Sequence, residues 1–261
     1  MQKKTLITVI AHKPYAMPED DLYLPLQVGA AGKPKIGFAA DDSGENISDK
    51  NPYFCELTGL YWAWKNLDCE YLGLVHYRRY FAGNEKFNVN GKIKGILSAE
   101  KLDCLLAKND IILPKKRNYW IETLYSHYAH TMYVEPLDIT GQIIAEKYPE
   151  YLTEFAKLKK RRTAHMFNIF VMKKTLLNEY CTWLFDILFE LEKRVNAKKY
   201  DGFHARFYGR VSELLLDVWL KTNQHKYAEV KLISLEKVNW WKKGISFLRA
   251  KFNGKKYEKS F

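Results

Sequence analysis

The sequence contains no run of 18 consecutive apolar residues, so no segment of it qualifies as a membrane-spanning helix. Cysteine is scarce and forms no C-x-x-C pair; the four residues are Cys55, Cys69, Cys104 and Cys181. Scattered thiols of this kind are typical of reduced proteins of the cytoplasm. The apolar stretch near the N-terminus ends at His12 and Lys13, too soon for a secretory signal peptide. We therefore expect a cytoplasmic protein.

Several catalytic signatures are also missing. The chain has no G-x-S-x-G turn, no Walker A loop and no G-x-G-x-x-G loop, which disfavours common hydrolases, P-loop kinases and Rossmann dehydrogenases. It has no Asp-x-Asp triplet and no zinc-ligand spacing. No acid-x-acid triplet follows a predicted strand, where it would hold Mg²⁺ or Mn²⁺ against a nucleotide diphosphate. We therefore predict no metal cofactor, and we expect arginine and lysine to balance the charge of any bound diphosphate.

The remaining composition is that of a folded protein with an excess of basic and aromatic residues. The 261 residues are 47% hydrophobic and 28% charged, which is enough to build a core without metals or disulfides. The formal net charge is +12, and aromatic residues make up 15% of the chain. Most aromatic side chains are expected to fill the core, while others are of the kind that lines sugar and nucleotide clefts.

The excess of positive charge is concentrated at the C-terminus. Residues 226–261 hold ten basic and three acidic residues, a balance of +7 out of +12. If residues 239–252 are helical, Trp241, Ile245, Leu248 and Phe252 share one face between lysines, a pattern typical of a helix on an anionic membrane surface. A helix packed on the domain is the alternative, and no motif supports nucleic-acid binding. We predict a domain over 1–225 and a basic aromatic extension over 226–261 that anchors the protein peripherally at the membrane.

Short apolar segments alternate with amphipathic ones along the chain. Strands are predicted at 5–11, 35–40, 71–76, 110–113 and 164–172. Helices are predicted at 51–66, 98–106, 135–147, 176–194 and 211–221. This alternation predicts an α/β fold with a mostly parallel sheet flanked by helices. Ligands of such sheets bind beyond the carboxyl ends of the strands, so we expect His12, Asp41, His76 and Arg78 to meet at one edge.

Polar residues after the predicted strands are candidates for binding an anionic ligand. Arg78 and Arg79 follow the strand at 71–76, and a guanidinium binds phosphate through two parallel hydrogen bonds. Adjacent side chains on an extended chain point to opposite sides, so at most one of the two is expected to face the ligand. Either arginine would otherwise pair with a structural carboxylate. His76 is placed to donate to the same oxygens.

Acidic residues offer two kinds of role. Asp41, Asp42 and Asn46 follow a predicted strand and would either bind ribose and base or cap a turn. Candidates for the catalytic general base are Glu213, Asp138 and His130. Glu213 lies near the start of a predicted helix, where an acid is also favourable for structural reasons alone.

Several stretches resemble bacterial capsule and exopolysaccharide biosynthesis proteins of the DUF4422 type, which are regarded as glycosyltransferases. The most specific are NPYFCELTGLYWAWKN at 51–66 and GLVHYRRYF at 73–81. Further stretches are 46–48, 110–114, 148–151, 168–172, and Arg206 with Gly209 and Glu213. The resemblance runs from about Thr8 to Leu220 and excludes the basic extension.

This resemblance implies a GT-A-like transferase that uses a nucleotide sugar. The loop Ala11–Lys13 would contact uracil and ribose, and His76-Tyr77-Arg78 stands where metal-dependent relatives have Asp-x-Asp. The expected donor-binding residues are His12, Lys13, Asp41, Asp42, Asn46, His76, Arg78, Arg79, Asn168 and Arg206. Some relatives look like galactofuranosyltransferases, which makes UDP-galactofuranose the leading donor.

The sequence thus predicts an inverting, UDP-sugar-dependent hexosyltransferase at the inner face of the membrane. Its acceptor would be a lipid-diphosphate-linked glycan in capsule, exopolysaccharide or O-antigen biosynthesis. The alternative is a scaffold that binds a nucleotide sugar or polysaccharide without catalysis.

Overall fold

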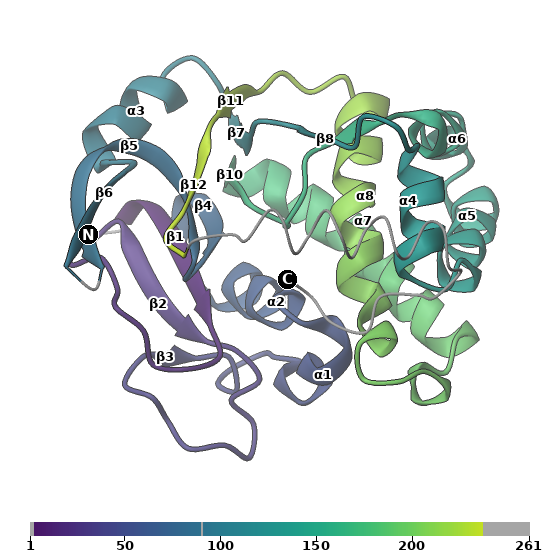
Figure 1. Cartoon of the computed structure of the whole chain (residues 1–261), viewed down its shortest axis with the longest axis horizontal. Coiled ribbons are helices and arrows are strands. Elements are labelled where there is room, and N and C mark those ends of the chain that lie inside the picture. The colour runs from purple at the N-terminus through teal and green to yellow at the C-terminus, as the bar shows by residue number, and fades with distance from the viewer. Residues whose placement is uncertain (1–2, 90, 237–261) are drawn as a thin grey trace.

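A computed structural model of the chain describes residues 3–89 and 91–236 (Figure 1). The strands are β1 (Lys3–Ala11), β2 (Tyr23–Gln27), β3 (Ala39–Ala40), β4 (Cys69–His76), β5 (Arg79–Val89), β6 (Lys92–Ile96), β7 (Ile111–Pro114), β8 (Arg117–Asn118), β9 (Thr163–Ala164), β10 (Phe170–Lys173), β11 (Ala228–Val230) and β12 (Leu232–Ser234). The α-helices are α1 (Asn51–Phe54), α2 (Leu57–Asn66), α3 (Ala99–Leu106), α4 (Leu124–Thr131), α5 (Glu135–Lys147), α6 (Leu152–Lys160), α7 (Lys174–Arg194) and α8 (Phe207–Thr222). Short 3₁₀ turns span Ser48–Lys50, Pro149–Tyr151, Ala197–Lys199 and His204–Arg206.

The main sheet has the strand order β11-β7-β10-β4-β1-β2-β3. The pairs β1–β2, β1–β4, β2–β3 and β7–β11 are parallel, and β10 runs antiparallel to both of its neighbours. In the register of the two central strands, Ile10 lies opposite His76, so β1 and β4 end at the same edge. β5 turns back from β4 and pairs with β6 and β12. The predicted α/β fold with a mostly parallel, helix-flanked sheet is therefore confirmed.

The alternation of side chains along β1 divides the core into two layers. Leu6 and Ile10 pack toward the helices on one face of the sheet, where α7 and α8 contribute more buried apolar side chains than any other element. Ile7 and Val9 face the opposite layer, which is built from β5, β6 and α3. Figure 1 shows the helical layer extending beyond the sheet, with α4, α5 and α6 at its far side.

Two predicted elements are interrupted, and both interruptions lie near the edge where β1 and β4 end. The helix predicted over 51–66 divides at Cys55, whose φ of 54° is left-handed and cannot continue an α-helix. The strand predicted over 164–172 divides at Phe167 and Asn168, with φ of 78° and 51°. Left-handed backbone in non-glycine residues costs free energy and concentrates at functional sites.

The predicted strand at 35–40 is mostly wrong, because only Ala39–Ala40 pairs with the sheet. The strand beside it is β2, which the sequence pattern did not reveal. The motif of β2 is YLPLQ, whose proline is unusual inside a strand and hides the pattern.

The start of the predicted C-terminal extension belongs to the sheet. β11 pairs with β7, and β12 pairs with β5, so a boundary after residue 225 falls just before two strands of the domain. The aromatic helix predicted at 239–252 lies outside the described residues. Along the described part of the chain, no helix combines the length and the apolar character needed to cross a bilayer.

Candidate functional site

Three polar side chains pack around the ring of Tyr77 at the edge where β1 and β4 end. Tyr77 itself is buried, and its backbone N–H donates to the carbonyl of Ile10 on β1. The His12 ring packs edge-on against it with centroids 5.4 Å apart. The Nζ of Lys13 lies 5.6 Å from the ring centroid, and the Cζ of Arg78 lies 5.1 Å from it. One aromatic ring therefore holds a histidine and two cations together.

The surroundings of His12 are strongly cationic. Its pKa is lowered by partial burial and by the charges of Lys13, Arg78, Arg206 and Lys33. These side chains come from four separate parts of the sequence, and His12, Lys13, Lys33 and Arg206 are solvent-exposed. Arg206 immediately precedes α8, so the positive end of that helix points the same way. We call these five residues the His12 cluster; an exposed group of cations at a helix N-terminus suits a phosphate ligand.

A second group of charges surrounds Glu213 on α8. Glu213 is 5% exposed, and its Oε2 is buried without a partner among the described residues. Burial, reinforced by the charge of nearby Glu56 and opposed by Arg210, Arg117 and Arg79, raises the pKa of Glu213 to about 7. Arg210 lies one helical turn earlier, with its Nη1 3.4 Å from Oε1 of Glu213.

These five residues, Glu56, Arg79, Arg117, Arg210 and Glu213, are the Glu213 cluster. A carboxyl group with a pKa near 7 exchanges a proton readily at neutral pH, which is what a general base requires. The three guanidinium groups around it can stabilise negative charge. The cluster therefore has the chemistry for proton transfer next to an anion.

Asn168 ties the two interrupted elements to α8. Its Nδ2 donates to Oε1 of Glu56 at 2.7 Å and to the carbonyl of Gly209 at 3.3 Å. Its Oδ1 accepts from the hydroxyl of Ser212 at 3.1 Å. The left-handed conformations at Cys55 and Asn168 allow these contacts, because they turn the chain beside Glu56 and place the amide against α8. Asn168, predicted to bind the donor, thus has its hydrogen bonds within the protein and positions Glu56.

The two adjacent arginines lie in different clusters, as predicted, but the reason is a turn and not an extended chain: Arg78 lies in the two-residue turn between β4 and β5, and Arg79 begins β5. Arg78 pairs with Glu236 at 3.1 Å and belongs to the His12 cluster. Arg79 is more enclosed, stacks over the ring of Phe167 at 4.4 Å and belongs to the Glu213 cluster. Burial lowers the pKa of His76, whose Nε2 is buried without a partner in the described chain. His76 is therefore neutral at pH 7; it precedes both arginines in the chain, and their charges lower its pKa further.

Asp41 has a structural role instead of the donor-binding role that we predicted. It is fully buried and accepts from the backbone N–H groups of Gly29 and Ala30 at 2.9 and 3.0 Å. It also accepts from the hydroxyls of Ser48 and Thr58. With four donors around it, Asp41 fixes the loop after β2 against α2 and has no remaining contact to offer a ligand.

Replacement of Asp41 by Ala tests this role. We expect a loss of about 3 kcal/mol or more in the free energy of unfolding, because buried donors would be left without acceptors. Asp42→Ala is the matched control; its exposed ion pair with Lys35 is expected to contribute less than about 1 kcal/mol. Urea unfolding followed by circular dichroism measures both. Equal stability of the two variants would contradict the structural role of Asp41.

Other predicted residues are also engaged by the protein. Asn46 caps its own turn through Gly44 and Ser48. Both oxygens of Asp138 are occupied, one by the Tyr125 hydroxyl at 3.0 Å and one by Lys159 at 2.9 Å. We therefore do not carry Asn46, Asp42 or Asp138 into the proposed site.

His130 belongs to a pair of histidines joined by one carboxylate. Glu122 is 4% exposed and accepts from Nδ1 of His130 at 2.6 Å and from Nδ1 of His127 at 3.1 Å. The His127 ring packs on Tyr119, whose pKa responds to Arg117 and Glu213. The start of α4 thus borders the Glu213 cluster. No group of three or more potential metal ligands occurs within 3–89 and 91–236.

Sequence reasoning missed Glu56, Arg117 and Arg210. Glu56 stood inside an apparently continuous helix, so its place at a break was hidden. Arg117 follows two lysines and resembled a solvated basic run. Only Arg210 could have been predicted from the sequence, because it precedes Glu213 by three residues and therefore lies on the same face of the helix.

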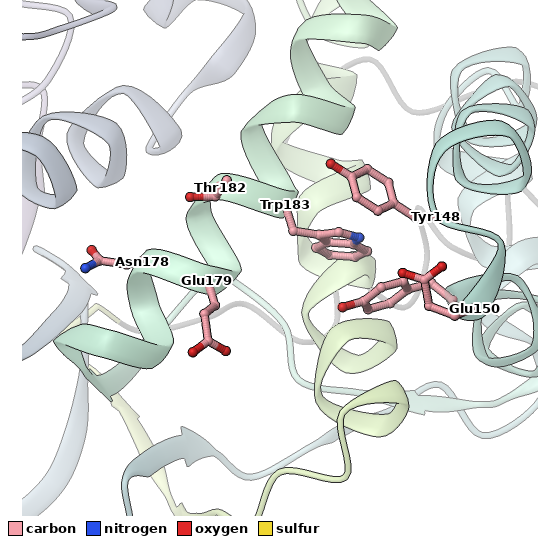
Figure 2. A pocket seen from close by; sticks show the side chains of 7 residues that line it. Tyr148, Glu150, Asn178, Glu179, Thr182 and Trp183 are labelled. Atoms are coloured by element: carbon pink, nitrogen blue, oxygen red, sulfur yellow. The ribbon is translucent and has the colours of Figure 1, made fainter.

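A surface pocket lies away from both clusters (Figure 2). Its volume is about 450 Å³, and its lining residues are Tyr148, Glu150, Tyr151, Asn178, Glu179, Thr182 and Trp183. Figure 2 shows Trp183 between Tyr148 and the neighbouring ring, with Glu179 and Asn178 along α7. Tyr151 contacts Asn223 beyond the C-terminal end of α8, about 21 Å along the helix from Gly209. This pocket has two acids and no basic residue in its lining, so it is unsuited to a diphosphate.

Fold and site together define an α/β protein with a cationic cluster and a buried carboxyl group of raised pKa at the carboxyl edge of a mostly parallel sheet. The chain belongs to the DUF4422 family, described as a domain of unknown function, whose sequence model matches residues 6–224. The family assignment made from the motifs is therefore confirmed.

One similar solved structure is the apo form of WbbM, described as a bifunctional glycosyltransferase. The two chains are 29% identical with a TM-score of 0.81, over 90% of this chain and 46% of WbbM. The chain thus corresponds to less than half the length of WbbM. A search of curated proteins found no match.

Proposed function

We propose that the chain is a glycosyltransferase that transfers a sugar from a nucleotide diphosphate to a hydroxyl group of a glycan. The observation that carries the proposal is the pair of clusters at one sheet edge, one cationic and exposed, the other built around a carboxyl group with a pKa of about 7. The fold similarity to a bifunctional glycosyltransferase supports it. This sequence lacks the phosphate-binding loops of dehydrogenases and P-loop kinases, which disfavours both classes.

The proposed reaction is a direct displacement at the anomeric carbon of the donor. The ionised carboxylate of Glu213 accepts the proton of the acceptor hydroxyl while that oxygen bonds to the anomeric carbon. The bond from this carbon to the diphosphate oxygen breaks, and its electron pair leaves with the nucleotide. The His12 cluster stabilises the negative charge that develops on the leaving group. Displacement in one step inverts the configuration of the anomeric carbon.

The identity of the substrates is a further part of the proposal. We propose UDP as the nucleotide and a hexose, with galactofuranose first, as the sugar, because of the resemblance of the motifs to such enzymes. The acceptor would be a lipid-diphosphate-linked glycan in capsule, exopolysaccharide or O-antigen biosynthesis.

Nucleotide binding is the simplest test of the proposal. UDP is expected to raise the melting temperature of the protein, because a ligand that binds only the folded state stabilises that state. ADP and GDP are expected to leave the melting temperature unchanged. Excess EDTA is expected to leave the UDP shift unchanged, since lysine and arginine balance the diphosphate charge. Slow release of UDP from a UDP-sugar without acceptor would then distinguish a transferase from a non-catalytic scaffold. Absence of any nucleotide shift would reject the proposed donor site.

A further inference from the structure

The loop between β8 and α4 exposes two adjacent apolar side chains. Trp120 is 75% exposed and Ile121 is 60% exposed. Among the large apolar side chains that the structure describes, only Ile93 is comparably exposed. Trp120 has a left-handed φ of 55°. Exposed side chains of this size cost solvation free energy, and a strained conformation that presents them needs a compensating role.

The backbone holds this loop in its exposed conformation. The N–H of Tyr119 donates to the carbonyl of Arg162 at 2.9 Å, and the N–H of Leu124 donates to the carbonyl of Arg161 at 2.7 Å. The guanidinium of Arg162 donates to the carbonyl of Trp120 at 2.9 Å. Both ends and the tip of the loop are thereby fixed to the segment that follows α6. The apolar pair is presented outward and does not fold back on the surface.

Basic residues surround the loop. Three precede the loop in the chain, and five lie at the end of α6 or directly after it. They are Lys115, Lys116, Arg117, Lys157, Lys159, Lys160, Arg161 and Arg162. β8 and β9 pair with each other and bring the two basic segments together. Some of these cations are paired with Glu154 or Asp138, but Lys115, Lys160 and Arg162 make no ion pair with any residue that the structure describes.

A shallow pocket lies beside the loop. Its volume is about 390 Å³, and its lining residues are Thr123, Tyr125, Ala156, Lys159 and Lys160. The Nζ of Lys159 lies 4.3 Å from the centroid of the Tyr125 ring. The lining combines apolar surface with two lysines, one of which, Lys160, makes no ion pair with a described residue; this combination suits a phosphate group that is attached to an apolar body.

We propose that the loop from Tyr119 to Thr123 docks on an anionic lipid bilayer, with Trp120 and Ile121 among the headgroups and the basic residues against the lipid phosphates. Tryptophan with an aliphatic neighbour and a basic surround is the combination found at membrane interfaces. A glycan would stack on the ring of Trp120, but glycan binding would not explain the exposed Ile121 beside it. Nucleic acid would need a longer basic surface with bases stacked on aromatic rings.

The position of the loop links this surface to the candidate site. Arg117 precedes the loop by two residues and its charge lowers the pKa of Glu213, and Tyr119 packs on His127 beside the same cluster. Figure 1 shows the segment from β7 through β8 passing across α8 before it enters α4. Docking would therefore bring the Glu213 cluster close to the bilayer surface. If the proposed function holds, a lipid-linked acceptor would reach Glu213 from the membrane. The docking of the loop does not depend on the proposed function.

Hydrogen exchange on the full chain tests the docking locally. Vesicles of equimolar phosphatidylglycerol and phosphatidylcholine are expected to slow amide exchange in peptides covering 118–123, and pure phosphatidylcholine vesicles are not. The β5–β6 hairpin around Ile93 serves as the internal control and should exchange as before. No donor or acceptor is present, so the result is independent of transfer activity. Unchanged exchange in 118–123 on bound protein would overturn the proposal, as would protection by a soluble oligosaccharide alone.

Substitution of the apolar pair provides a second measurement. Trp120→Ser with Ile121→Ser is expected to weaken vesicle partitioning about tenfold or more, because the apolar contribution to interfacial binding is removed. Ile93→Ser is the matched control, since Ile93 is 68% exposed on β6 and should not alter partitioning. Each variant should keep the melting temperature and the circular dichroism spectrum of the wild type, which shows that it is folded. Wild-type partitioning of the double variant would contradict the proposed docking loop.

Discussion

Replacement of Glu213 by Gln is expected to lower kcat about a thousandfold, within the range that a general base contributes. Glutamine keeps the size of the side chain and its hydrogen bond with Arg210, but it cannot take the proton of the acceptor hydroxyl. The affinity for UDP should change little, because the diphosphate is assigned to the His12 cluster. Kinetics of sugar transfer together with UDP titration separate the two effects.

The pH dependence of kcat provides an independent signature of the same residue. Glu213 acts as a base only when ionised, and burial raises its pKa from the ordinary 4.5 to about 7. Below pH 7 the protonated fraction grows, so kcat of the wild type should fall about tenfold per pH unit and level off above pH 7. The Glu213→Gln variant should lack this limb.

Asp138→Asn is the matched control for both measurements, because Asp138 was the other carboxylate candidate. Its oxygens contact Tyr125 and Lys159, so the substitution should leave kcat and the pH profile close to the wild type. A strong loss of kcat in Asp138→Asn with an active Glu213→Gln enzyme would reverse the assignment.

The sequence was sufficient to predict the sheet edge but not the roles of the residues near it. Apolar runs placed β1 and β4, and the parallel register brings His12 and His76 to the same edge because both strands are continuous. The chemistry of Asp41 could not be inferred, since a carboxylate after a strand looks the same whether it binds ribose or four donors of its own protein. The distinction depends on the course of the loop around Gly29 and Ala30, which has no periodic pattern.

The Glu213 cluster illustrates a second limit of sequence patterns. Glu56 and Asn168 approach α8 only because the backbone is left-handed at Cys55 and at Asn168 itself. Helix and strand periodicity predict regular elements across both positions, so the interruptions that build the site were the features least accessible to prediction. The raised pKa of Glu213 likewise arises from burial among residues that are distant in sequence.

Replacement of Arg78 and replacement of Arg79 are expected to affect different properties of the enzyme, namely UDP affinity and kcat. Arg78→Ala, combined with Arg206→Ala, should raise the dissociation constant for UDP about a hundredfold or more, because each charge-assisted contact contributes roughly 1.5–3 kcal/mol. Arg79→Ala should leave UDP affinity nearly intact and reduce kcat instead, because Arg79 lies in the Glu213 cluster and stacks on Phe167. Isothermal titration with UDP and steady-state kinetics of transfer distinguish the two outcomes.

Arg194→Ala is the control for a general loss of positive charge, because Arg194 pairs with Glu146 and Glu190 on the surface of α7. It should change neither UDP affinity nor kcat. If Arg79→Ala weakened UDP binding as strongly as the Arg78 and Arg206 pair, the two clusters would form one anion site. The separation of donor binding from proton transfer would then be wrong. If the split holds, two neighbouring residues of identical chemistry serve different steps, because Arg78 lies in the two-residue turn after β4 whereas Arg79 is the first residue of β5.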